Sequence, residues 1–451
     1  WGAYLRRLES TNVSSNSNEN FDPLLPATIA NAQGSMDRSL TESSTWGLSL
    51  QYTDTQPWAG MDNQWSLGAT LDAGRTEFRQ WSAPGNFTAD RTVTVIGAET
   101  MDTFARTHNR YAGLYFTDTL SLNQHWHTTL SGRWNNAQVN IADASGSNPA
   151  LNGDHHYSRV NPAIGLNFTP VASFTAYGSY NEGMRVATPM ELSCADPAIP
   201  CKLPNNFLAD PSLKPVISRT LETGMRGHLS EDLSYSAAIF RTTLDDDIQF
   251  ISSGGNVNAG YFQNVGQTRR QGLELGVEQR LGKLNLSAGY SYLQATYESA
   301  LTLHSPSNSS AGAGGDIQVQ SSDKMPGIPQ HNLRLRADYT VERGRIGASL
   351  VAVGSQYARG DENNRDSHGK LPGYSVVNLD GEYHLGRDWD LLGRVSNLFD
   401  RRYEGVAVLG DNLFTGPGRS FNPAGAVAEQ FRSPASPRGI WIGLRYAWSG
   451  K

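Results

Sequence analysis

The two cysteines of the chain have the most definite chemistry. Cys194 and Cys201 are the only cysteines among the 451 residues, and they bracket the proline-rich segment Cys-Ala-Asp-Pro-Ala-Ile-Pro-Cys. In an oxidising compartment such a pair closes a loop through a disulfide. The alternative is a pair of thiolates on a soft metal ion, but no third or fourth ligand lies nearby in the sequence. The disulfide is the favoured interpretation, and it would stiffen the loop.

A second set of side chains could hold a small ligand. Adjacent histidines that follow an acidic residue can ligate a metal ion, although a solvated loop is the plainer interpretation of this pattern. An arginine near a strand end presents a planar fork that suits an anionic chelate or the carboxylates of another domain. Loop aromatics can stack on an aromatic chelate. The candidates of these kinds are His155, His156, Arg185, Tyr261, Phe262, Tyr357 and Arg359.

Other charged features allow structural interpretations. The acidic run 245–247 offers hard oxygen ligands for Ca²⁺, but it lacks the spacing of a calcium loop and is interpreted as a solvated loop face. Arg269 and Arg270 are expected to face the mouth or the lumen of the fold described below, where a salt bridge to another domain competes with ligand contact. The sequence has no nucleophile elbow, P-loop, His-Glu-x-x-His or dinucleotide-binding glycine motif. We therefore predict neither an enzyme nor a resident metal or cofactor.

The composition narrows the classes of protein that could carry these residues. The chain has a formal net charge of −6 and a mean hydropathy of −0.46, with 18% charged and 10% aromatic residues. It has no run of about 18 apolar residues that could form a transmembrane helix. The negative charge and the lack of lysine and arginine clusters argue against a nucleic-acid partner. A large soluble β protein and a membrane β-barrel remain, because a barrel turns every second residue to its lumen.

The dominant period of the sequence is two, which is the period of a β-strand. Near the C-terminus Ile440, Ile442, Leu444, Tyr446 and Trp448 share one face, and small or polar residues alternate with most of them. The same alternation recurs upstream, for example over residues 46–52, 284–292, 333–339 and 377–383. The apolar stripes often end in tyrosine or tryptophan. That ending favours the aromatic girdle of a membrane barrel over aromatic packing in a soluble core.

The lengths of the connections between these strands alternate as well. Short links fall near residues 55–63, 119–125, 169–173, 228–233, 281–284, 341–345 and 385–388. Long polar links fall at 10–43, 80–104, 140–157, 183–215, 250–262, 298–329, 356–371 and 400–437. This is the rule of an up-and-down outer-membrane barrel, with short periplasmic turns and long extracellular loops. We predict an all-β antiparallel transmembrane barrel with about 16 strands, and a solvated, mobile loop tip at 304–324.

Several segments of the second half carry a resemblance to a known family. They are VSNLFDRRY at 395–403, LPGYSVVNL at 371–379, IPQHN at 328–332, YNEGMRVATPMEL at 180–192 and ETGMR at 222–226. Together they resemble the β-barrel of TonB-dependent outer-membrane receptors, from about residue 110 to the end of the chain. The resemblance implies a receptor that binds a scarce nutrient, typically a ferric siderophore or another metal chelate, and imports it to the periplasm with TonB-coupled energy.

The resemblance also implies parts that the chain is not expected to contain. The family barrel has about 22 strands and encloses an N-terminal plug domain that carries the contact with TonB. No segment resembles a plug, and residue 1 falls inside an expected strand. Residues 1–451 are therefore expected to be a partial receptor-type barrel that lacks the plug and the first strands. The expected partners are outer-membrane lipid, TonB through the missing plug, and the chelate, with a monomer in the bacterial outer membrane.

Two other functions remain open. A passive porin needs no plug, and about 16 strands would suit one, although a porin does not carry the receptor-like segments. A soluble or secreted β-rich binding protein could show the same alternation, but its apolar face would be buried in a core.

Overall fold

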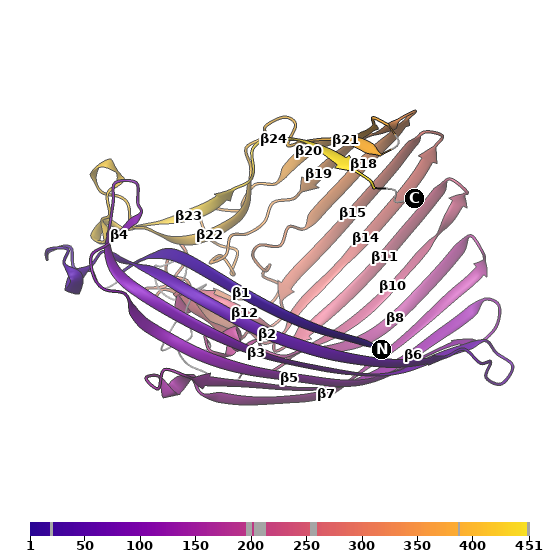
Figure 1. Ribbon diagram of the computed structural model, residues 1–451, viewed down its shortest axis with the longest axis horizontal. Coiled ribbons are helices and arrows are strands. Elements are labelled where there is room, and N and C mark those ends of the chain that lie inside the picture. The colour runs from indigo at the N-terminus through magenta and orange to yellow at the C-terminus, as the bar shows by residue number, and fades with distance from the viewer. Residues whose placement is uncertain (19–20, 195–200, 203–212, 253–258, 387, 449–451) are drawn as a thin grey trace.

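A single antiparallel sheet dominates the structure. The computed structural model describes residues 1–18, 21–194, 201–202, 213–252, 259–386 and 388–448 (Figure 1). Within these residues the sheet has 17 strands, of which β4 (Val93–Val95) is a short flap on β3, so that 16 strands form the wall. Each wall strand pairs with the wall strands before and after it in the chain, which confirms the predicted up-and-down order and strand number.

The wall strands are long and are joined in hairpins. They are β1 (Gly2–Ser17), β2 (Gly34–Asp54), β3 (Asn63–Phe87), β5 (Thr100–Ser121), β6 (Trp126–Asp143), β7 (Gly153–Val171), β8 (Phe174–Arg185), β10 (Val216–Ser230), β11 (Leu233–Asp245), β14 (Thr268–Leu281), β15 (Leu284–Tyr297), β18 (His331–Val341), β19 (Gly344–Val353), β20 (Tyr374–His384), β21 (Trp389–Ser396) and β24 (Gly439–Tyr446).

The remaining elements lie in the long connections, which gather at one end of the wall (Figure 1). We call this the long-loop end, and the opposite end the short-turn end. The elements are the helix α1 (Pro189–Leu192), the short strands β9 (Cys201–Lys202), β12 (Ile248–Ser252), β13 (Ala259–Asn264), β16 (Leu301–His304), β17 (Asp316–Val319), β22 (Glu404–Asn412) and β23 (Val427–Pro434), and 3-10 turns at Ile29–Asn31, Pro149–Leu151, Pro417–Arg419 and Pro423–Gly425. In the described part of the chain, no helix is long and apolar enough to cross a membrane.

The apolar faces of the wall strands point outward and are exposed. Leu48 and Leu50 of β2 are 42% and 53% exposed, and Ile442 of β24 is 79% exposed. In a soluble sandwich this face would be buried, whereas in a membrane barrel it meets lipid. We call these side chains the apolar belt: Leu48, Leu50, Leu67, Leu71, Leu114, Phe116, Leu130, Val160, Ile164, Leu221, Ile239, Leu275, Val277, Leu335, Ile346, Leu391, Ile440, Ile442 and Leu444.

Aromatic side chains border the apolar belt at the short-turn end. The rings of Tyr52 and Trp65 lie 5.5 Å apart, and those of Trp126 and Phe168 lie 4.4 Å apart. Trp389 makes a similar contact with Tyr446 at 4.9 Å. Aromatic rings are favoured at the boundary between the hydrocarbon and headgroup layers of a membrane. The pairs therefore mark the short-turn boundary of the membrane-facing band, in agreement with the predicted girdle.

Several stretches that were predicted as loops prolong the wall instead. β1 and β2 stay paired as far as Ser17 opposite Gly34, so that only residues 18–33 connect them, and not 10–43. The connection predicted at 140–157 is likewise shorter, because β6 runs to Asp143 and β7 begins at Gly153. These strand ends lie beyond the apolar belt, where both faces can be polar. Backbone pairing continues there although the alternation that identifies a strand is lost.

The inner face of the wall is polar and rich in ion pairs. On β18 to β20, Arg336 contacts Asp338 at 2.6 Å and Asp380 at 2.9 Å, and Arg345 contacts Asp380 at 3.2 Å. These residues alternate with the outward-facing Leu335, Ala337 and Tyr339. The alternation of odd and even positions along each strand thus predicted correctly which side chains face outward and which face the lumen.

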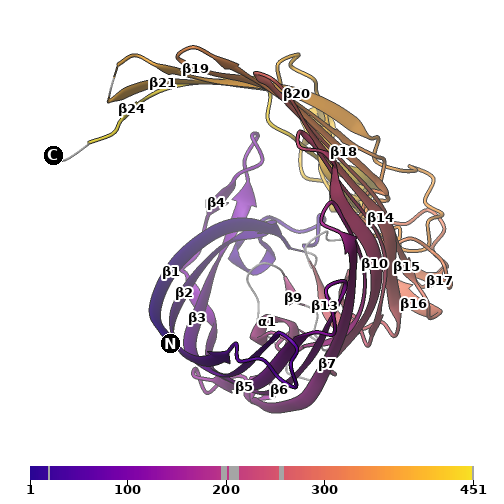
Figure 2. The ribbon, with the colours of Figure 1, turned by 90° about the vertical axis from the view of Figure 1, so that its right-hand side faces the viewer.

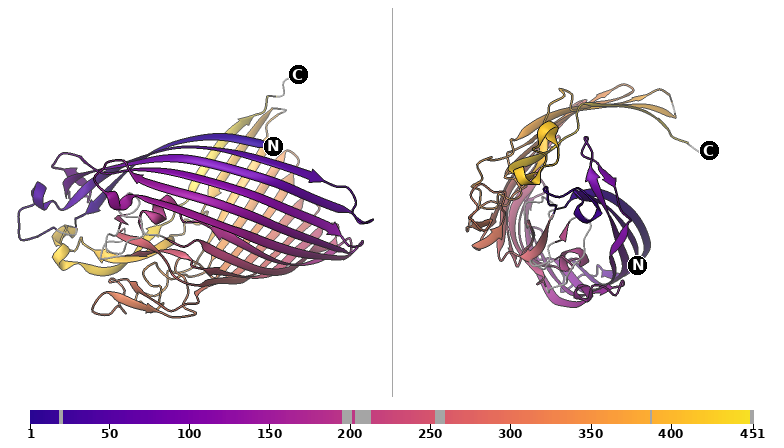
Figure 3. Two further views of the ribbon diagram at one scale, coloured as in Figure 1. Left: turned by 90° about the horizontal axis from the view of Figure 1, so that it is seen from below. Right: turned by 90° about the vertical axis from the view of Figure 1, so that its left-hand side faces the viewer.

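The sheet is curled but does not close. Figure 2 and Figure 3 show β1 to β3 curving tightly on one side while β19, β21 and β24 arch away from them. In the described ranges, the outer edge of β1 has no strand partner, and neither does the outer edge of β24. The same views place α1, β9 and β13 within the curve of the sheet, and β16 and β17 outside it.

Candidate functional site: the long-loop mouth

Parts of two long connections fold inward at the long-loop end of the lumen (Figure 2). The connection between β8 and β10 contributes Leu192 and Leu213, and that between β11 and β14 contributes Ile248. These side chains pack against Val139 and Ile141 on the inner face of β6, and Leu192 and Val139 are completely buried. We call this apolar cluster the mouth core. It anchors the connections to the inner face of the wall.

The helix α1 is set in place by its own cap. The Thr188 hydroxyl accepts a hydrogen bond from the Glu191 amide at 3.2 Å, and the Glu191 carboxylate accepts one from the Thr188 amide at 2.8 Å. This capping box satisfies backbone donors at the start of the helix. The same carboxylate also binds the Arg185 guanidinium, with contacts of 2.9 and 2.8 Å. Arg185 is therefore held at the mouth, with a side chain that is 46% exposed.

Arg185 lines a cavity of about 450 Å³ in the lumen, beneath the mouth core. Arg133 of β6 lines the same cavity and donates to the Thr70 hydroxyl at 2.8 Å and to the Asn135 side-chain oxygen at 2.7 Å. Each guanidinium has five N–H donors, so both arginines keep donors for a further acceptor. The cavity thus offers donors from two arginines to an anionic group, beside one carboxylate, that of Asp72. Sequence reasoning missed Arg133, although its parity in 126–143 identifies it as inward-facing.

Cys194 ties the inward fold together. It is disulfide-bonded and 1% exposed, and the chain has one other cysteine, Cys201, whose side chain lies outside the described residues. The Cys194 carbonyl accepts the amide of Phe262 at 2.6 Å. The backbone of β9 pairs with β13, Cys201 opposite Gly260. These contacts join the cysteine loop to the hairpin β12–β13.

Tyr261 and Phe262 pack within the mouth. Phe262 packs against the mouth core and meets the ring of Phe250 at 5.2 Å. Tyr261 packs on the other side of β13, against a second apolar cluster that includes Ile251 and Tyr297. Burial raises the pKa of the Tyr261 hydroxyl above its ordinary value. Both rings hold the hairpin against its neighbours.

The two adjacent histidines point to opposite faces of β7. His155 faces inward, is 9% exposed and stacks on Tyr157 with a centroid distance of 6.4 Å. His156 faces outward, and its Nε2 atom lies 3.4 Å from Asp154. Because successive side chains of a strand alternate, these imidazoles do not converge on one ion. The Tyr157 hydroxyl donates to the Leu213 carbonyl at 3.1 Å and so joins the wall to the mouth core.

Tyr357 and Arg359 lie on the connection between β19 and β20, which is fixed by the hairpin β22–β23. The Arg359 amide donates to the Ala407 carbonyl at 3.0 Å, and the Arg359 carbonyl accepts from the Leu409 amide at 2.8 Å. The guanidinium is exposed and its carbon lies 5.9 Å from the ring centre of Phe250. The Lys370 ammonium lies 4.7 Å from the ring centre of Tyr357. The two candidates thus sit on the rim of the mouth and not with Arg185 in the cavity.

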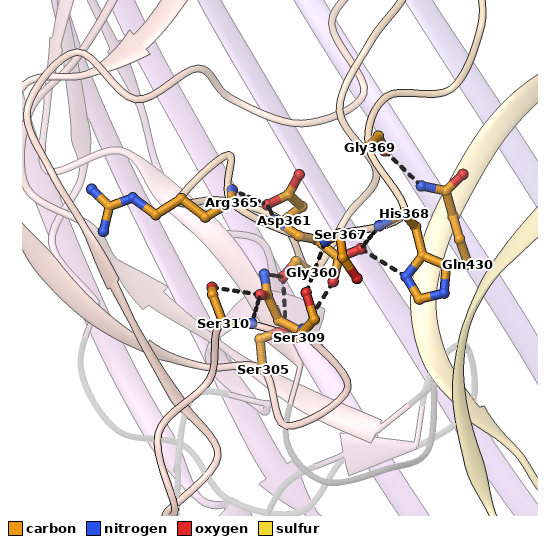
Figure 4. Close-up of polar contacts among 12 residues, drawn as sticks. Ser305, Ser309, Ser310, Gly360, Asp361, Arg365, Ser367, His368, Gly369 and Gln430 are labelled. Atoms are coloured by element: carbon orange, nitrogen blue, oxygen red, sulfur yellow. Dashed lines mark hydrogen bonds and ion pairs between the residues drawn. The ribbon is translucent and has the colours of Figure 1, made fainter.

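A polar network joins three of the long connections (Figure 4). Asp361 is 1% exposed and accepts the amides of Arg365 at 2.8 Å and Asp366 at 2.9 Å, and its burial raises its pKa. Asn308 donates to the Gly360 carbonyl at 2.9 Å, and Gln430 of β23 donates to the Gly369 carbonyl at the same distance. The prediction of a solvated loop tip at 304–324 is therefore wrong for residues 305–308, whereas residues 309, 310, 312–314 and 320–322 are exposed as predicted. Leu303, Ser305, Ser307 and Asn308 are all buried because the neighbouring connection covers them.

The network predicts an acid-sensitive contact at Asp366. Burial alone would raise the pKa of this carboxyl, but the amides of Ser309 and His368, each at 2.9 Å, hold it below the ordinary 3.8. A depressed pKa contributes stability above about pH 4 that is lost as pH falls through the folded-state value. We expect D366N to lower the local stability by about 1–3 kcal/mol at pH 7 and by less at pH 3.

Hydrogen exchange of the Ser309 amide in wild type and variant at both pH values measures this effect. The matched control is D316N, which removes an exposed partner of His304 at 3.0 Å in the same connection and should change exchange little. Equal loss of protection at pH 7 and pH 3 in D366N would contradict the assignment.

The other charged candidates are engaged with partners in the chain. Arg270 contacts Asp247 at 3.2 Å, and Arg269 contacts Glu298 at 3.1 Å. Asp247 is 4% exposed and also accepts from Thr268 at 2.8 Å. The acidic run 245–247 is therefore not a solvated loop face at this residue. By the register of β14, Arg270 faces inward as expected, whereas Arg269 faces outward.

Three side chains that could ligate a metal ion come together at the short-turn end, but an arginine lies among them. In the described ranges, Glu382, His384 and Asp390 are the only three metal-ligating side chains whose donor atoms come together. The Arg445 guanidinium contacts Asp390 at 2.7 Å and also binds Glu382. A cation in their midst neutralises the carboxylates, so the cluster is an ion-pair network at the base of the lumen.

Comparison with known proteins identifies the fold family. The family model described as TonB dependent receptor-like, beta-barrel, matches residues 1–398. A probable TonB-dependent siderophore receptor, PiuA of Acinetobacter baumannii, is 28% identical over 314 residues, which are 68% of this chain and 39% of the relative. The ferric-pyoverdine receptor PbuA of a Pseudomonas species is 27% identical over 274 residues, 58% of this chain and 29% of the relative.

The solved structures agree with this assignment. The copper transporter OprC superimposes with a TM-score of 0.65 at 19% identity, over 99% of this chain and 62% of the transporter. The chain thus spans less than half of the length of the curated relatives named above and about three-fifths of this structure. The family match, the up-and-down sheet and the exposed apolar belt lead to one conclusion. The chain belongs to the β-barrel family of TonB-dependent receptors, which are proteins of the bacterial outer membrane and not enzymes.

Proposed function

We propose that this chain is part of a receptor that takes up a ferric siderophore or another metal chelate with energy delivered through TonB. The family supports this proposal, and so do relatives that are named as siderophore receptors. The observation that carries it is the mouth itself. Segments of two long connections are packed by the mouth core against the inner wall, above a cavity with two arginines. Such a mouth suits capture of a bulky anionic chelate better than free diffusion of small solutes.

The sheet edges support a second part of the proposal. An unpaired strand edge in lipid leaves backbone N–H and C=O groups unsatisfied, which is costly. We propose that further strands pair with the free edges of β1 and β24 in the functional barrel, and that a plug domain occupies its lumen and carries the contact with TonB. The half-exposed ion pairs of the inner wall, such as Arg445 with Asp390, are suitable partners for such a domain. The functional unit is proposed to be a monomer.

The proposed ligand site is the long-loop mouth and not the short-turn end. Arg185 and Arg133 are proposed to hold an anionic group of the chelate in the cavity, and Arg359 and Tyr357 to lie on the rim around it. Tyr261, Phe262 and His155 act through the packing that positions the connections. His156 is assigned no ligand contact, because it faces outward beside Asp154.

The experiment that tests this site is the double substitution R133Q/R185Q in the full-length receptor. We expect it to weaken binding of the transported chelate by at least about tenfold, because charge-assisted hydrogen bonds to arginine contribute roughly 1.5–3 kcal/mol each. The matched control is R110Q/R241Q, which also removes two arginine charges, but from the outer face of the wall. Equilibrium binding of the radiolabelled chelate to whole cells measures the effect. Unchanged binding in the double variant would refute the cavity as the ligand site.

A further inference from the structure

The arginines on the outer face of the wall have a one-sided distribution. Strand register places the following on this face, all of them on the long-loop side of the apolar belt: Arg7, Arg38, Arg75, Arg79, Arg106, Arg110, Arg219, Arg241 and Arg269. Among the described wall strands, no arginine or lysine occupies the outer face between the belt and the short turns. A membrane with equivalent leaflets gives no reason for such asymmetry. It points to a difference in chemistry between the two headgroup layers.

The arginines nearest to the belt form a patch around a small residue. Arg7, Ser44, Arg75 and His108 lie opposite one another on β1, β2, β3 and β5. Arg110 lies one step closer to the belt, opposite Ala73. Trp46, which is 46% exposed on the outer face, marks the belt boundary just below Ser44. The short Ser44 side chain leaves a recess between two guanidinium groups at the level where lipid headgroups begin.

A second patch repeats this arrangement farther along the wall. Arg219 and Arg269 lie opposite Thr243 from either side, and Arg241 lies opposite Leu221 of the belt. We call the six arginines nearest to the belt the arginine collar: Arg7, Arg75, Arg110, Arg219, Arg241 and Arg269. Each patch therefore places three collar arginines around a short hydroxyl-bearing residue.

The charges of the collar are only partly neutralised by the protein. In the described part of the chain, neither an ion pair nor a hydrogen bond involves the side chains of Arg7, Arg110 and Arg241, and all three residues are exposed. The next row outward behaves differently, since Glu42 contacts Arg79 at 2.6 Å and Glu77 contacts Arg106 at 3.1 Å. Three collar arginines are also paired, Arg75 with Glu77, Arg219 with Asp245 and Arg269 with Glu298. The free positive charge of the collar therefore belongs to Arg7, Arg110 and Arg241.

We propose that the arginine collar binds the phosphate groups of anionic lipids in the leaflet at the long-loop end. The planar guanidinium fork matches two phosphate oxygens, and the hydroxyl of Ser44 or Thr243 supplies a neutral donor between the forks. The collar fixes the depth and orientation of the barrel independently of the transported ligand. The proposal of lipid binding by the collar therefore does not depend on the proposed uptake function.

The test uses the full-length receptor in a neutral detergent, with native mass spectrometry to measure lipid binding. The probe is dioleoyl phosphatidic acid, and dioleoyl phosphatidylcholine is the lipid without net charge. R7Q/R110Q/R241Q is expected to bind the acidic probe on the order of 100-fold more weakly, from about fivefold for each arginine near a lipid surface. Binding of phosphatidylcholine should not change. R110Q alone breaks no contact in the described residues and should lose about fivefold, which keeps the test informative if the triple variant does not fold.

The matched control replaces three arginines of the inner face by glutamine. R226Q/R334Q/R394Q removes three lumen-facing arginines from the wall and should leave binding of phosphatidic acid unchanged. An equal loss in this control would show an effect of net charge and overturn the collar. Full affinity in both outer variants would also overturn it. If millimolar inorganic phosphate displaced all of the bound phosphatidic acid, the patches would be sites for free phosphate and not for a lipid surface.

Discussion

Replacing Leu192 by aspartate is expected to open the mouth and to reduce uptake by the full-length receptor severely. Leu192 is fully buried in the mouth core with Val139 and Ile141. An unpaired carboxylate at this position would cost several kcal/mol, because its ionised form loses hydration without gaining a partner. The segment around α1 would then leave the wall. Since Glu191 of that helix holds Arg185, the substitution would also release an arginine of the cavity.

Two measurements separate this effect from a general failure to fold. Trypsin should cleave the variant after Arg185, just before the segment, faster than the wild type, while the wall strands stay resistant. Initial uptake of the radiolabelled chelate should fall by more than tenfold, because the loss of the charge-assisted contact of Arg185 alone costs roughly 1.5–3 kcal/mol. The matched control is M190D in the same helix, because Met190 is 37% exposed and an aspartate there stays hydrated. Equal behaviour of L192D and M190D would disprove the role of the mouth core.

The wall was predictable from the sequence because its faces follow a local rule. Side chains alternate along a strand, so the parity of Leu48 and Leu50 assigned them to lipid, and the parity of Arg336 and Asp338 assigned them to the lumen. The rule ends where neither face meets lipid. This is why the paired extensions of β1 and β2 had the appearance of loops in the sequence.

The mouth was less predictable because its order depends on contacts between distant segments. Ser305 and Asn308 have the composition of a solvated loop, yet they are buried under Gly360, more than 50 positions away in the chain. No local pattern distinguishes these two cases. Similarly, the candidates Tyr261 and Phe262 were identified as loop aromatics, and only the pairing of β12 with β13 shows that their rings pack on opposite sides of a hairpin. Arg133 could have been found by parity, but only the fold of α1 brings Arg185 to the same cavity.

Planar-bilayer recordings should distinguish the receptor from a passive porin, which the 16 wall strands of this chain would also suit. The full-length receptor is expected to show no stable conducting steps, because a plug is proposed to fill the lumen. The mouth core alone would not seal it, since the inner wall below carries half-exposed charges such as Arg336 and Arg345 that water can reach. Removing the proposed plug while keeping every wall strand should therefore produce large, stable steps.

The two arms of this experiment depend on each other. If the full-length protein conducts steadily, the lumen is open and the porin interpretation replaces the receptor. If neither form conducts, the connections at the mouth close the lumen by themselves, and the plug is not needed to explain a silent channel. Adding L192D to the form without the plug resolves that case, because an unpacked mouth core should then raise the conductance. Only closure by a plug predicts silence in the full-length protein together with large steps after the plug is removed, whether or not Leu192 is intact.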